Sequence, residues 1–252
     1  MHRFFVPPSC IGPSAVELAA PMAHQIANVL RLRPGEHICV LDNSGWEVEV
    51  ELVAVAKELA RGRVVRRRLV ASEPAVKITL YQGMLKADRF EFALQKCTEL
   101  GAVGFVPLIT ARTVLSAVGD IDDRRAQRWR RIAIEAAEQA GRGRLPVIHP
   151  AVVFQSACEE AAGLSLIPWE EEHGTGLRQV LRERFAPEAG RGRPFAVNLF
   201  VGPEGGFTAA EVDLARRHGI TPVTMGPRIL RAETAAAVAT AAVLYEAGEL
   251  GG

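Results

Sequence analysis

Apolar and polar residues alternate over short stretches in the first seventy residues, and this pattern is typical of β-strands. The clearest case is Trp46-Glu-Val-Glu-Val-Glu-Leu52, where every second residue is apolar. After Pro21, an apolar stripe at three- and four-residue spacing predicts one helix. Short strands, turns and a single helix indicate a small β-barrel that spans residues 1–72. The other predicted strands cover residues 3–6, 37–41 and 63–69.

Beyond a proline-containing linker at Ala71-Ser-Glu-Pro-Ala75, the pattern changes to strands that alternate with amphipathic helices. This alternation predicts an α/β domain over residues 73–252, built on a parallel sheet with helices packed on it. Strands are expected at 76–81, 103–109, 146–149, 164–167, 195–201 and 220–225. Helices are expected from residue 88, at 124–140, 154–162 and 176–185, after 208, and at 235–246.

Two loops near the C-terminus follow successive predicted strands. The first is Val201-Gly-Pro-Glu-Gly-Gly-Phe207, and the second is Met225-Gly-Pro-Arg-Ile-Leu-Arg-Ala-Glu-Thr-Ala235. Thr208 and Glu211 form a capping box, which starts a helix directly after the first loop. Glycine permits close backbone approach to a ligand, and ligands bind at the carboxyl edge of parallel strands. The loops therefore predict a ligand site, although neither a P-loop nor a G-x-G-x-x-G fingerprint is present.

Composition narrows the class of protein. The chain has 252 residues, 48% of them hydrophobic, with a mean hydropathy of +0.10 and a net charge of +1. The overall charge gives no case for nucleic acid, but residues 124–144 hold seven Arg against two Glu, and Arg66-Arg67-Arg68 forms a second basic cluster. The cysteines and histidines lack metal-ligand spacing. No signal peptide or membrane span is predicted, so we expect a cytoplasmic protein without a metal.

The two loops together resemble the signature of the RsmE family of SPOUT-class methyltransferases, which methylate N3 of a uridine in 16S (small-subunit) ribosomal RNA. The resemblance covers nearly the whole chain, except that Gly190-Arg-Gly-Arg193 matches nothing and predicts a flexible loop. It implies a SPOUT-type trefoil-knotted parallel sheet with helices on both faces, preceded by a PUA-like RNA-binding β-barrel. The knot rests on the resemblance alone. Further matching stretches are Arg3-Phe-Phe, His24, Asn28–Gly35, Gly83–Lys86, Gln95–Gly101, Thr110-Ala-Arg112, Gln139–Arg144 and Glu170-Glu171.

The resemblance implies S-adenosyl-L-methionine as methyl donor, no metal, a homodimer, and 16S ribosomal RNA or the small ribosomal subunit as partner. Uracil N3 lies on the Watson–Crick edge, so the target base must be unpaired or flipped out. The cofactor-binding residues that it implies are Val201, Gly202, Pro203, Glu204, Gly205, Gly206, Met225, Gly226, Ile229, Leu230, Thr234 and Ala235. The implied RNA-binding residues are Arg3, Arg31, Arg33, Lys86, Lys96, Arg112, Arg142 and Arg144.

Three residues are assigned to catalysis: Arg231, Glu204 and Glu233. Negative charge spreads to uracil O2 and O4 as the N3 proton leaves, and the guanidinium of Arg231 can stabilise it. Glu204 or Glu233 would orient Arg231 or accept the proton. Glu233 is also a charge that the start of a helix favours.

The residues leave other interpretations open. Lys96 and Glu99 are three residues apart and can form an ion pair on the surface of a helix. Arg31 and Arg33 can instead cap the C-terminal end of a helix, where positive charges are favourable. The same loops suit a SPOUT methyltransferase that acts on transfer RNA or on a ribose 2′-hydroxyl, because fold does not decide the substrate. A non-catalytic RNA-binding protein is a second alternative. A nucleotide-dependent oxidoreductase is a third, and the missing glycine fingerprint disfavours it.

Overall fold

The chain folds into two compact units. The computed structural model describes residues 1–86, 88–113, 123–186 and 195–251, so the loop predicted at Gly190–Arg193 lies outside the described residues. Unit 1 comprises Met1–Glu73 and Ala137–Leu145, and unit 2 comprises Pro74–Ala136 and Pro146–Gly252. The division falls one residue from the boundary expected between residues 72 and 73. It also adds residues 137–145 to the first unit, which no sequence pattern indicated.

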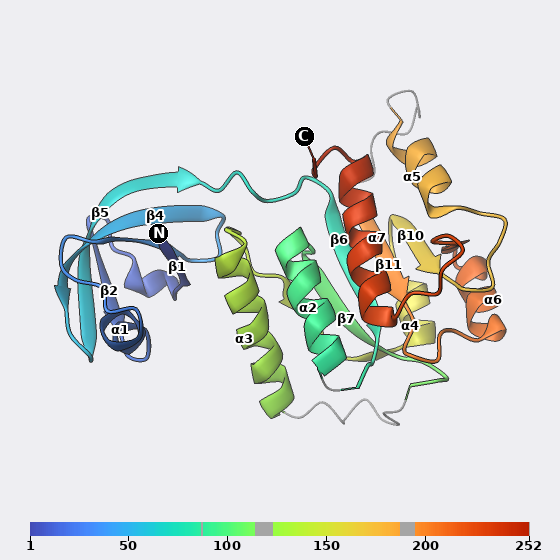
Figure 1. Cartoon of the computed structure of the whole chain (residues 1–252), viewed down its shortest axis with the longest axis horizontal. Helices are drawn as coiled ribbons and strands as arrows, with labels where there is room; N and C mark the ends of the chain where they lie inside the picture. The colour runs from blue at the N-terminus through green and yellow to red at the C-terminus, as the bar shows by residue number, and fades with distance from the viewer. Residues whose placement is uncertain (87, 114–122, 187–194, 252) are drawn as a thin grey trace. The chain divides into compact units, whose positions relative to one another are not determined.

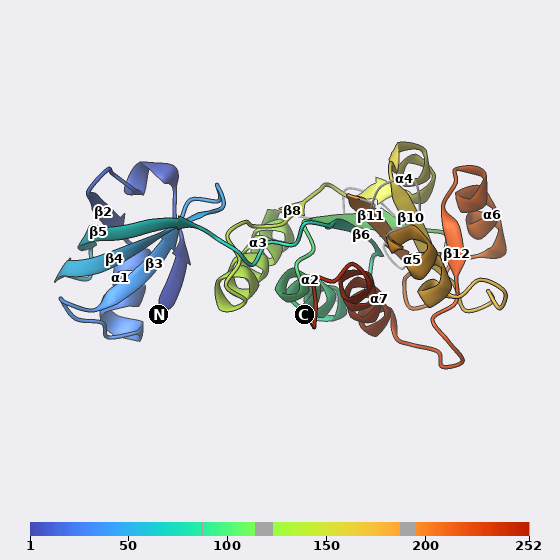
Figure 2. The same ribbon diagram turned by 90° about the horizontal axis from the view of Figure 1, so that it is seen from above.

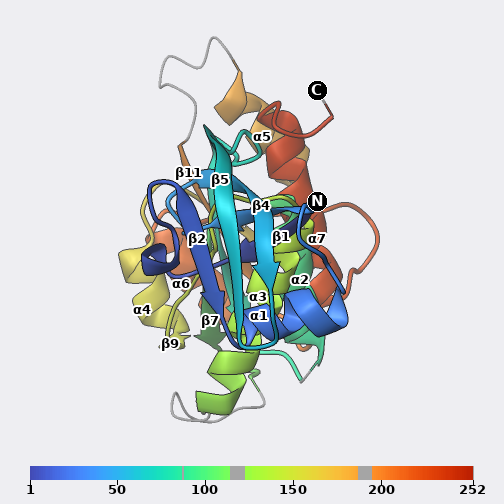
Figure 3. The ribbon, with the colours of Figure 1, turned by 90° about the vertical axis from the view of Figure 1, so that its left-hand side faces the viewer.

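Unit 1 is a five-stranded sheet, curled into a half-barrel, in the order β1-β3-β4-β5-β2. β1 runs parallel to β3 and the other pairs are antiparallel; Figure 3 shows β2, β5 and β4 side by side. The alternating segment forms a long strand as predicted, whereas the strand at Ala15–Ala19 was not predicted. The strands are β1 (His2–Phe5), β2 (Ala15–Ala19), β3 (His37–Leu41), β4 (Trp46–Val55) and β5 (Leu59–Leu69).

The helix predicted after Pro21 is present in unit 1 but is short and irregular. It consists of α1 (Met22–His24), which continues into a π-helical turn η2 (Gln25–Val29); a 3-10 turn η1 (Pro8–Cys10) precedes it. Ile26 is fully buried and packs with Phe4, Ile38 and Val50 in the core of this unit. The apolar stripe of this helix thus packs into the core of unit 1.

Unit 2 is built on a parallel sheet, as the alternating pattern predicts. Its strands follow the order β12-β10-β11-β6-β7-β8, and β9 also pairs with β7. Every pairing is parallel. The strands are β6 (Lys77–Gly83), β7 (Gly104–Ile109), β8 (Val147–Ile148), β9 (Val152–Val153), β10 (Leu164–Pro168), β11 (Ala196–Val201) and β12 (Thr221–Val223).

Helices cover both faces of this sheet. Figures 1 and 2 show α2 and α7 on one face and α4 and α6 on the other. Successive strand residues point to opposite faces of the sheet. Leu80 and Leu199 pack with α2, α5 and α7 on one face. On the opposite face, the ring of Tyr81 stacks on that of Phe200, with 4.4 Å between the ring centroids. The helices are α2 (Asp88–Leu100), α3 (Asp123–Gln139), α4 (Phe154–Glu160), α5 (Leu177–Phe185), α6 (Ala209–Arg217) and α7 (Ala232–Glu246).

A local sequence signal accounts for the start of α6. Both halves of the Thr208–Glu211 capping box are formed at the start of α6. α7 is apolar on all sides, and its small residues Ala236, Ala239 and Thr240 are fully buried. The predicted α/β sheet with helices on both faces is confirmed, while the trefoil knot stays a prediction.

Candidate active site

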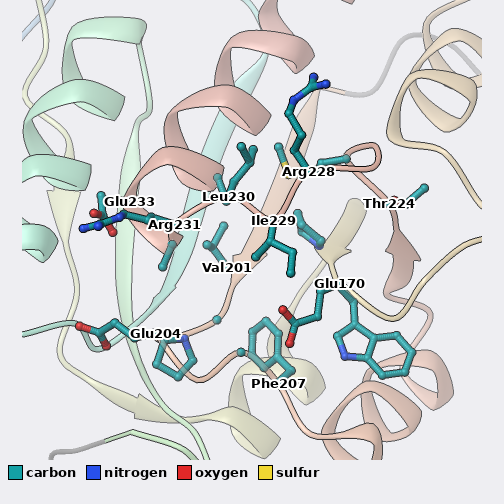
Figure 4. Close-up of a pocket in the computed structure, with 18 of the residues that line it drawn as sticks. Glu170, Val201, Glu204, Phe207, Thr224, Arg228, Ile229, Leu230, Arg231 and Glu233 are labelled. Carbon is teal, nitrogen blue, oxygen red and sulfur yellow. The ribbon is translucent and has the colours of Figure 1, made fainter.

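The two glycine-containing loops meet at one edge of the unit 2 sheet. β11 and β12 lie on either side of β10, so the loops that follow these three strands converge at their carboxyl ends. They enclose a cavity of about 330 Å³ (Figure 4). Of the residues predicted for the site, Gly205 and Thr234 do not line it. The predicted residues that do are Val201, Gly202, Pro203, Glu204, Gly206, Met225, Gly226, Ile229, Leu230, Arg231, Glu233 and Ala235.

The first loop is tightly packed against the end of β6. Gly206 has φ +68° and its N–H donates to the carbonyl of Pro203 at 2.9 Å, which closes the turn. A Cβ on Gly83 would lie 2.4 Å from the nitrogen of Pro203, so only glycine fits there. The buried amide of Gln82 faces the carbonyl of Gly202 at 3.3 Å. Neighbouring strands therefore fix the loop before any ligand arrives.

The second loop offers unpaired backbone groups beside apolar side chains. Gly226 has φ +104°, and Arg231 is the N-cap of α7. Among the described residues, the N–H groups of Arg228, Ile229 and Leu230 have no hydrogen-bond partner. The Ile229 side chain is 83% exposed, although it is large and apolar. Free donors and acceptors next to an apolar cover suit a flat heterocycle that carries polar edges.

Glu204 is held by residues that follow β6. Its Oε1 accepts from the backbone N–H of Lys86 at 3.1 Å and from the guanidinium of Arg89 at 3.4 Å. The orienting contact predicted between Glu204 and Arg231 is therefore absent from the described structure, and Arg89 takes that place. Arg89 also lines the cavity. Sequence reasoning missed it because nothing in the spacing of residues links α2 to the loop after β11.

Arg231 and Glu233 lie together at one side of the cavity (Figure 4). Neither side chain makes a hydrogen bond or ion pair with another residue that the structure describes. Oε2 of Glu233 is buried without a partner. A buried carboxylate oxygen without a partner is uncommon, and it suits an acceptor that awaits a proton or a ligand donor. The two groups therefore remain available for chemistry.

The loop after β10 completes the cavity. Pro168, Trp169, Glu170 and His173 all line it. The indole Nε1 of Trp169 is buried without a hydrogen-bond partner, and its ring lies 5.7 Å from the guanidinium of Arg216. The resemblance matched Glu170 and Glu171 to a loop at the ligand edge but implied no role for Glu170. Only the strand order shows that this loop lies between the two glycine-containing loops.

The comparisons with known proteins agree with this architecture. Residues 72–244 match the RNA methyltransferase domain family. The chain is 34% identical to ribosomal RNA small subunit methyltransferase E of Synechocystis sp., over 96% of this chain and 77% of the relative. It is 33% identical to the Bacillus subtilis protein of the same name, over 88% and 87%. The chain belongs to the RsmE family of RNA methyltransferases.

Solved structures of similar proteins contain a cofactor. One is the ribosomal RNA small subunit methyltransferase E of Neisseria gonorrhoeae bound to S-adenosyl methionine, with a TM-score of 0.82, 31% identity and 97% coverage of both chains. Another is a putative methyltransferase of Legionella pneumophila in complex with the same cofactor, with a TM-score of 0.84, 30% identity and 96% coverage of both chains. The predicted fold class, apart from its knot, and the predicted RsmE family are thus confirmed.

Two arginines of this RsmE-family chain that were predicted to bind RNA form ion pairs within unit 1. Arg142 is 2% exposed, and its guanidinium pairs with Glu73 at 3.0 Å. Arg3 is 16% exposed and pairs with Glu47 at 2.7 Å, and Glu47 also binds Arg68. The buried side chain of Arg142 presents little surface to a phosphate, whereas that of Arg3 is partly exposed. Both arginines hold carboxylates of unit 1 in place, and RNA contacts by either one stay a prediction.

The remaining basic residues divide into engaged and free side chains. Lys96 pairs with Glu99 at 2.8 Å, as the alternative interpretation of their spacing allowed. Arg112 donates to the carbonyl of Gly205 at 2.6 Å, and Arg144 donates to the carbonyl of Ser44 at 2.6 Å. Within the described residues, three of the predicted side chains are exposed without a partner: those of Arg31, Arg33 and Lys86.

Other kinds of chemistry find little support in the described part of the chain. No group of three or more His, Cys, Asp or Glu side chains lies together there as a metal site would require. None of the helices in that part is long and apolar enough to cross a membrane. Burial raises the pKa of the Cys97 thiol to about 12, which keeps it protonated at neutral pH. Cys97 is therefore unsuited to act as a nucleophile.

Proposed function

We propose that the protein transfers a methyl group from S-adenosyl-L-methionine to N3 of a uridine in 16S ribosomal RNA. The observation that carries this proposal is the single cavity shared by the loops after β10, β11 and β12, in a chain of the RsmE family. Relatives at 33% and 34% identity are named as ribosomal RNA small subunit methyltransferases. Structures of similar proteins hold the same cofactor.

The residues present fit this cofactor. Ile229 and Leu230 offer apolar cover for adenine, and the free N–H groups of their loop offer partners for its edge. Gly206, with φ +68°, permits the close approach that a side chain would prevent. When bound, the cofactor supplies a methyl group on a positively charged sulfur, which is already a strong electrophile. The protein therefore has mainly to position the reactants.

Arg231 and Glu233 are the proposed catalytic residues. The free guanidinium of Arg231 would stabilise the negative charge that develops on the uracil oxygens as N3 loses its proton. Glu233 would accept that proton, because its buried Oε2 has no partner, whereas Glu204 is held by Arg89 and Lys86. The role of Glu204 is then to position the first loop and Arg89. Of the two candidate general bases, we therefore assign the role to Glu233.

The RNA contacts that we propose come from exposed cations. Arg31 and Arg33 follow the η2 turn of unit 1, and Lys86 follows β6 of unit 2. Each can neutralise a phosphate, which makes binding sensitive to salt. The target nucleotide must leave its stack, because N3 is hidden in a base pair. The partner is 16S ribosomal RNA or the small ribosomal subunit, and the protein accordingly acts in the cytoplasm.

A homodimer forms the last part of the proposal. Val238 and Tyr245 of α7 are 44% and 67% exposed, on a helix that is apolar all round. Small residues at 234–242 let another helix approach closely. Light scattering at micromolar concentration should give twice the mass of 27.2 kDa. A mass of one chain would contradict the dimer.

The decisive experiment is nucleoside mass spectrometry of ribosomal RNA. RNA from a strain that lacks the gene should contain no 3-methyluridine in its 16S fraction, and the wild-type gene should restore it. Purified protein should methylate either free 16S RNA or the assembled small subunit, and comparison of the two identifies the true substrate. Unchanged 3-methyluridine in the deletion strain, or a methyl group found on a ribose, would overturn the proposal.

A further inference from the structure

The loop after β10 lies at the centre of the cavity and carries one carboxylate into it. The strand order is β12-β10-β11, so this loop is flanked on both sides by the glycine-containing loops. Glu170 is the only acidic residue of the loop among those that line the cavity. Figure 4 shows its carboxylate near the middle of the cavity, between Ile229 and Phe207. A ligand that spans the three loops must pass it.

The carboxylate of Glu170 is free, and its neighbours show why it is not simply part of the loop's framework. Glu172 holds the loop, because its Oε1 accepts from the N–H groups of Gly174 and Thr175. Glu170 has no hydrogen bond or ion pair with any residue that the structure describes. Its Oε1 would lie 3.3 Å from a Cβ on Gly206. The absent side chain at Gly206 thus leaves the carboxylate room beside the first loop.

The arrangement of the cavity sets which part of an adenosyl ligand meets Glu170. The apolar cover and the free N–H groups for the base belong to the loop after β12. The groups assigned to methyl transfer, Arg231 and Glu233, lie with Glu204 at one side of the cavity, away from Glu170 (Figure 4). The ribose joins the base to the sulfur, so it occupies the middle of the ligand. A carboxylate in the middle of the cavity therefore meets the ribose.

We propose that Glu170 binds the 2′- and 3′-hydroxyl groups of the cofactor's ribose, an inference that rests on the proposed cofactor. The two oxygens of a carboxylate can each accept from one of two adjacent hydroxyl groups. A carboxylate at the carboxyl edge of a parallel sheet performs this role in dinucleotide-binding folds. The competing partner for Glu170 is the positively charged amino group of the cofactor's methionine part. The two partners are separable, because ligands exist that lack one or the other.

The test uses calorimetric titration of wild-type protein, Glu170→Ala and the matched control Glu171→Ala. Glu171 is the next residue, is exposed and has the same charge, but does not line the cavity. The ligands are S-adenosylhomocysteine, 5′-methylthioadenosine, which lacks the amino-acid part, and the 2′-deoxy form of each. Thermal unfolding midpoints check folding, and they should be unchanged because Glu170 has no described partner to lose.

The expected result is that Glu170→Ala weakens both hydroxyl-bearing ligands by the same factor, about tenfold to a hundredfold. Wild-type protein and Glu171→Ala should bind the 2′-deoxy ligands less tightly, and Glu170→Ala should lose that preference. Weakening confined to S-adenosylhomocysteine assigns Glu170 to the amino group and overturns the inference, as does unchanged affinity. Failure of wild-type protein to bind S-adenosylhomocysteine at all would instead overturn the proposed cofactor.

Discussion

Arg3 and Arg142 of unit 1 differ from Arg231 of unit 2 in whether a carboxylate pairs with the side chain. In unit 1, Arg3 and Arg142 form ion pairs with Glu47 and Glu73, and Arg142 is buried. In unit 2, Arg231 lines an open cavity without a described partner. An arginine that forms an ion pair with a carboxylate thus stabilises the fold. An arginine without such a partner remains available to bind a ligand. The difference between the structural and the ligand-binding arginines is the presence of a carboxylate partner, which the sequence alone does not reveal.

Replacement of Arg142 by alanine should give the largest effect on stability. Loss of one partner of a buried pair leaves the other charge uncompensated, at a cost of about 3–5 kcal/mol. Thermal and urea unfolding of full-length protein would measure it. Arg144→Ala is the control, since Arg144 lies in the same loop with an exposed side chain. Equal stability of the two variants would contradict the structural role of Arg142.

The same ion pair predicts a loss of stability in acid. Burial by itself raises the pKa of Glu73, but hydrogen bonds from Arg142 and from the N–H groups of Gly143 and Arg144 lower it below the ordinary 4.5. A carboxyl whose folded pKa is depressed stabilises the fold above its unfolded pKa, and this stability is lost as pH falls through the folded pKa. Unfolding midpoints of wild-type protein should therefore drop below about pH 4.5. In Arg142→Ala that drop should be smaller.

Replacement of Arg231 should change catalysis and leave stability intact. Loss of a group that stabilises transition-state charge typically costs about a hundredfold to a thousandfold in rate. Single-turnover methylation at saturating cofactor should show this decrease for Arg231→Ala, with cofactor affinity nearly unchanged. Arg231→Lys should recover only part of the rate, because lysine lacks the planar fork. A near-normal rate with weakened cofactor binding would make Arg231 a loop-shaping residue.

A methyl group added at Gly83 tests whether packing behind the cavity matters as much as the residues within it. The Cβ of Gly83→Ala would meet the backbone of Gly202 and Pro203 at 2.7 and 2.4 Å, so the first loop must shift. Overpacking of this kind costs about 1–3 kcal/mol, and we expect cofactor affinity to fall by about tenfold or more. Gly176→Ala is the control, since nothing lies within 4 Å of its added Cβ. Equal affinity in both variants would show that the loop adapts.

The smallest expected effect concerns the free cations of unit 1. Arg31→Ala combined with Arg33→Ala should weaken RNA binding and lower the slope of its salt dependence by about one for each lost phosphate contact. Protein stability should remain near the wild-type value, because both side chains are exposed without a described partner. Filter binding over a range of salt concentrations measures the slope. An unaltered slope would place the RNA surface elsewhere.

The sequence by itself determined most of the fold of unit 2 and the location of its site. Periodicity predicted strands and helices there close to their observed bounds, because a parallel sheet covered on both faces requires continuous apolar strands and one-sided helices. The capping box at Thr208 and Glu211 fixed the start of α6 from four residues alone. The sequences of the two glycine-containing loops indicated the RsmE family, and the comparisons confirm that family. These signals depend on residues that are close together in the chain, so they can be recognised in the amino-acid sequence.

Only the tertiary structure decided which charged groups are free. Arg142 and Glu73 are 69 residues apart, and Arg89 and Glu204 are 115 apart, so no local pattern could pair them. The strand order brings the loop after β10 between the two glycine-containing loops, and this places Glu170 in the cavity. The assignment of residues 137–145 to unit 1 likewise depends on contacts distant in sequence. Whether two side chains form an ion pair or a hydrogen bond depends on their distance in space, and folding sets that distance.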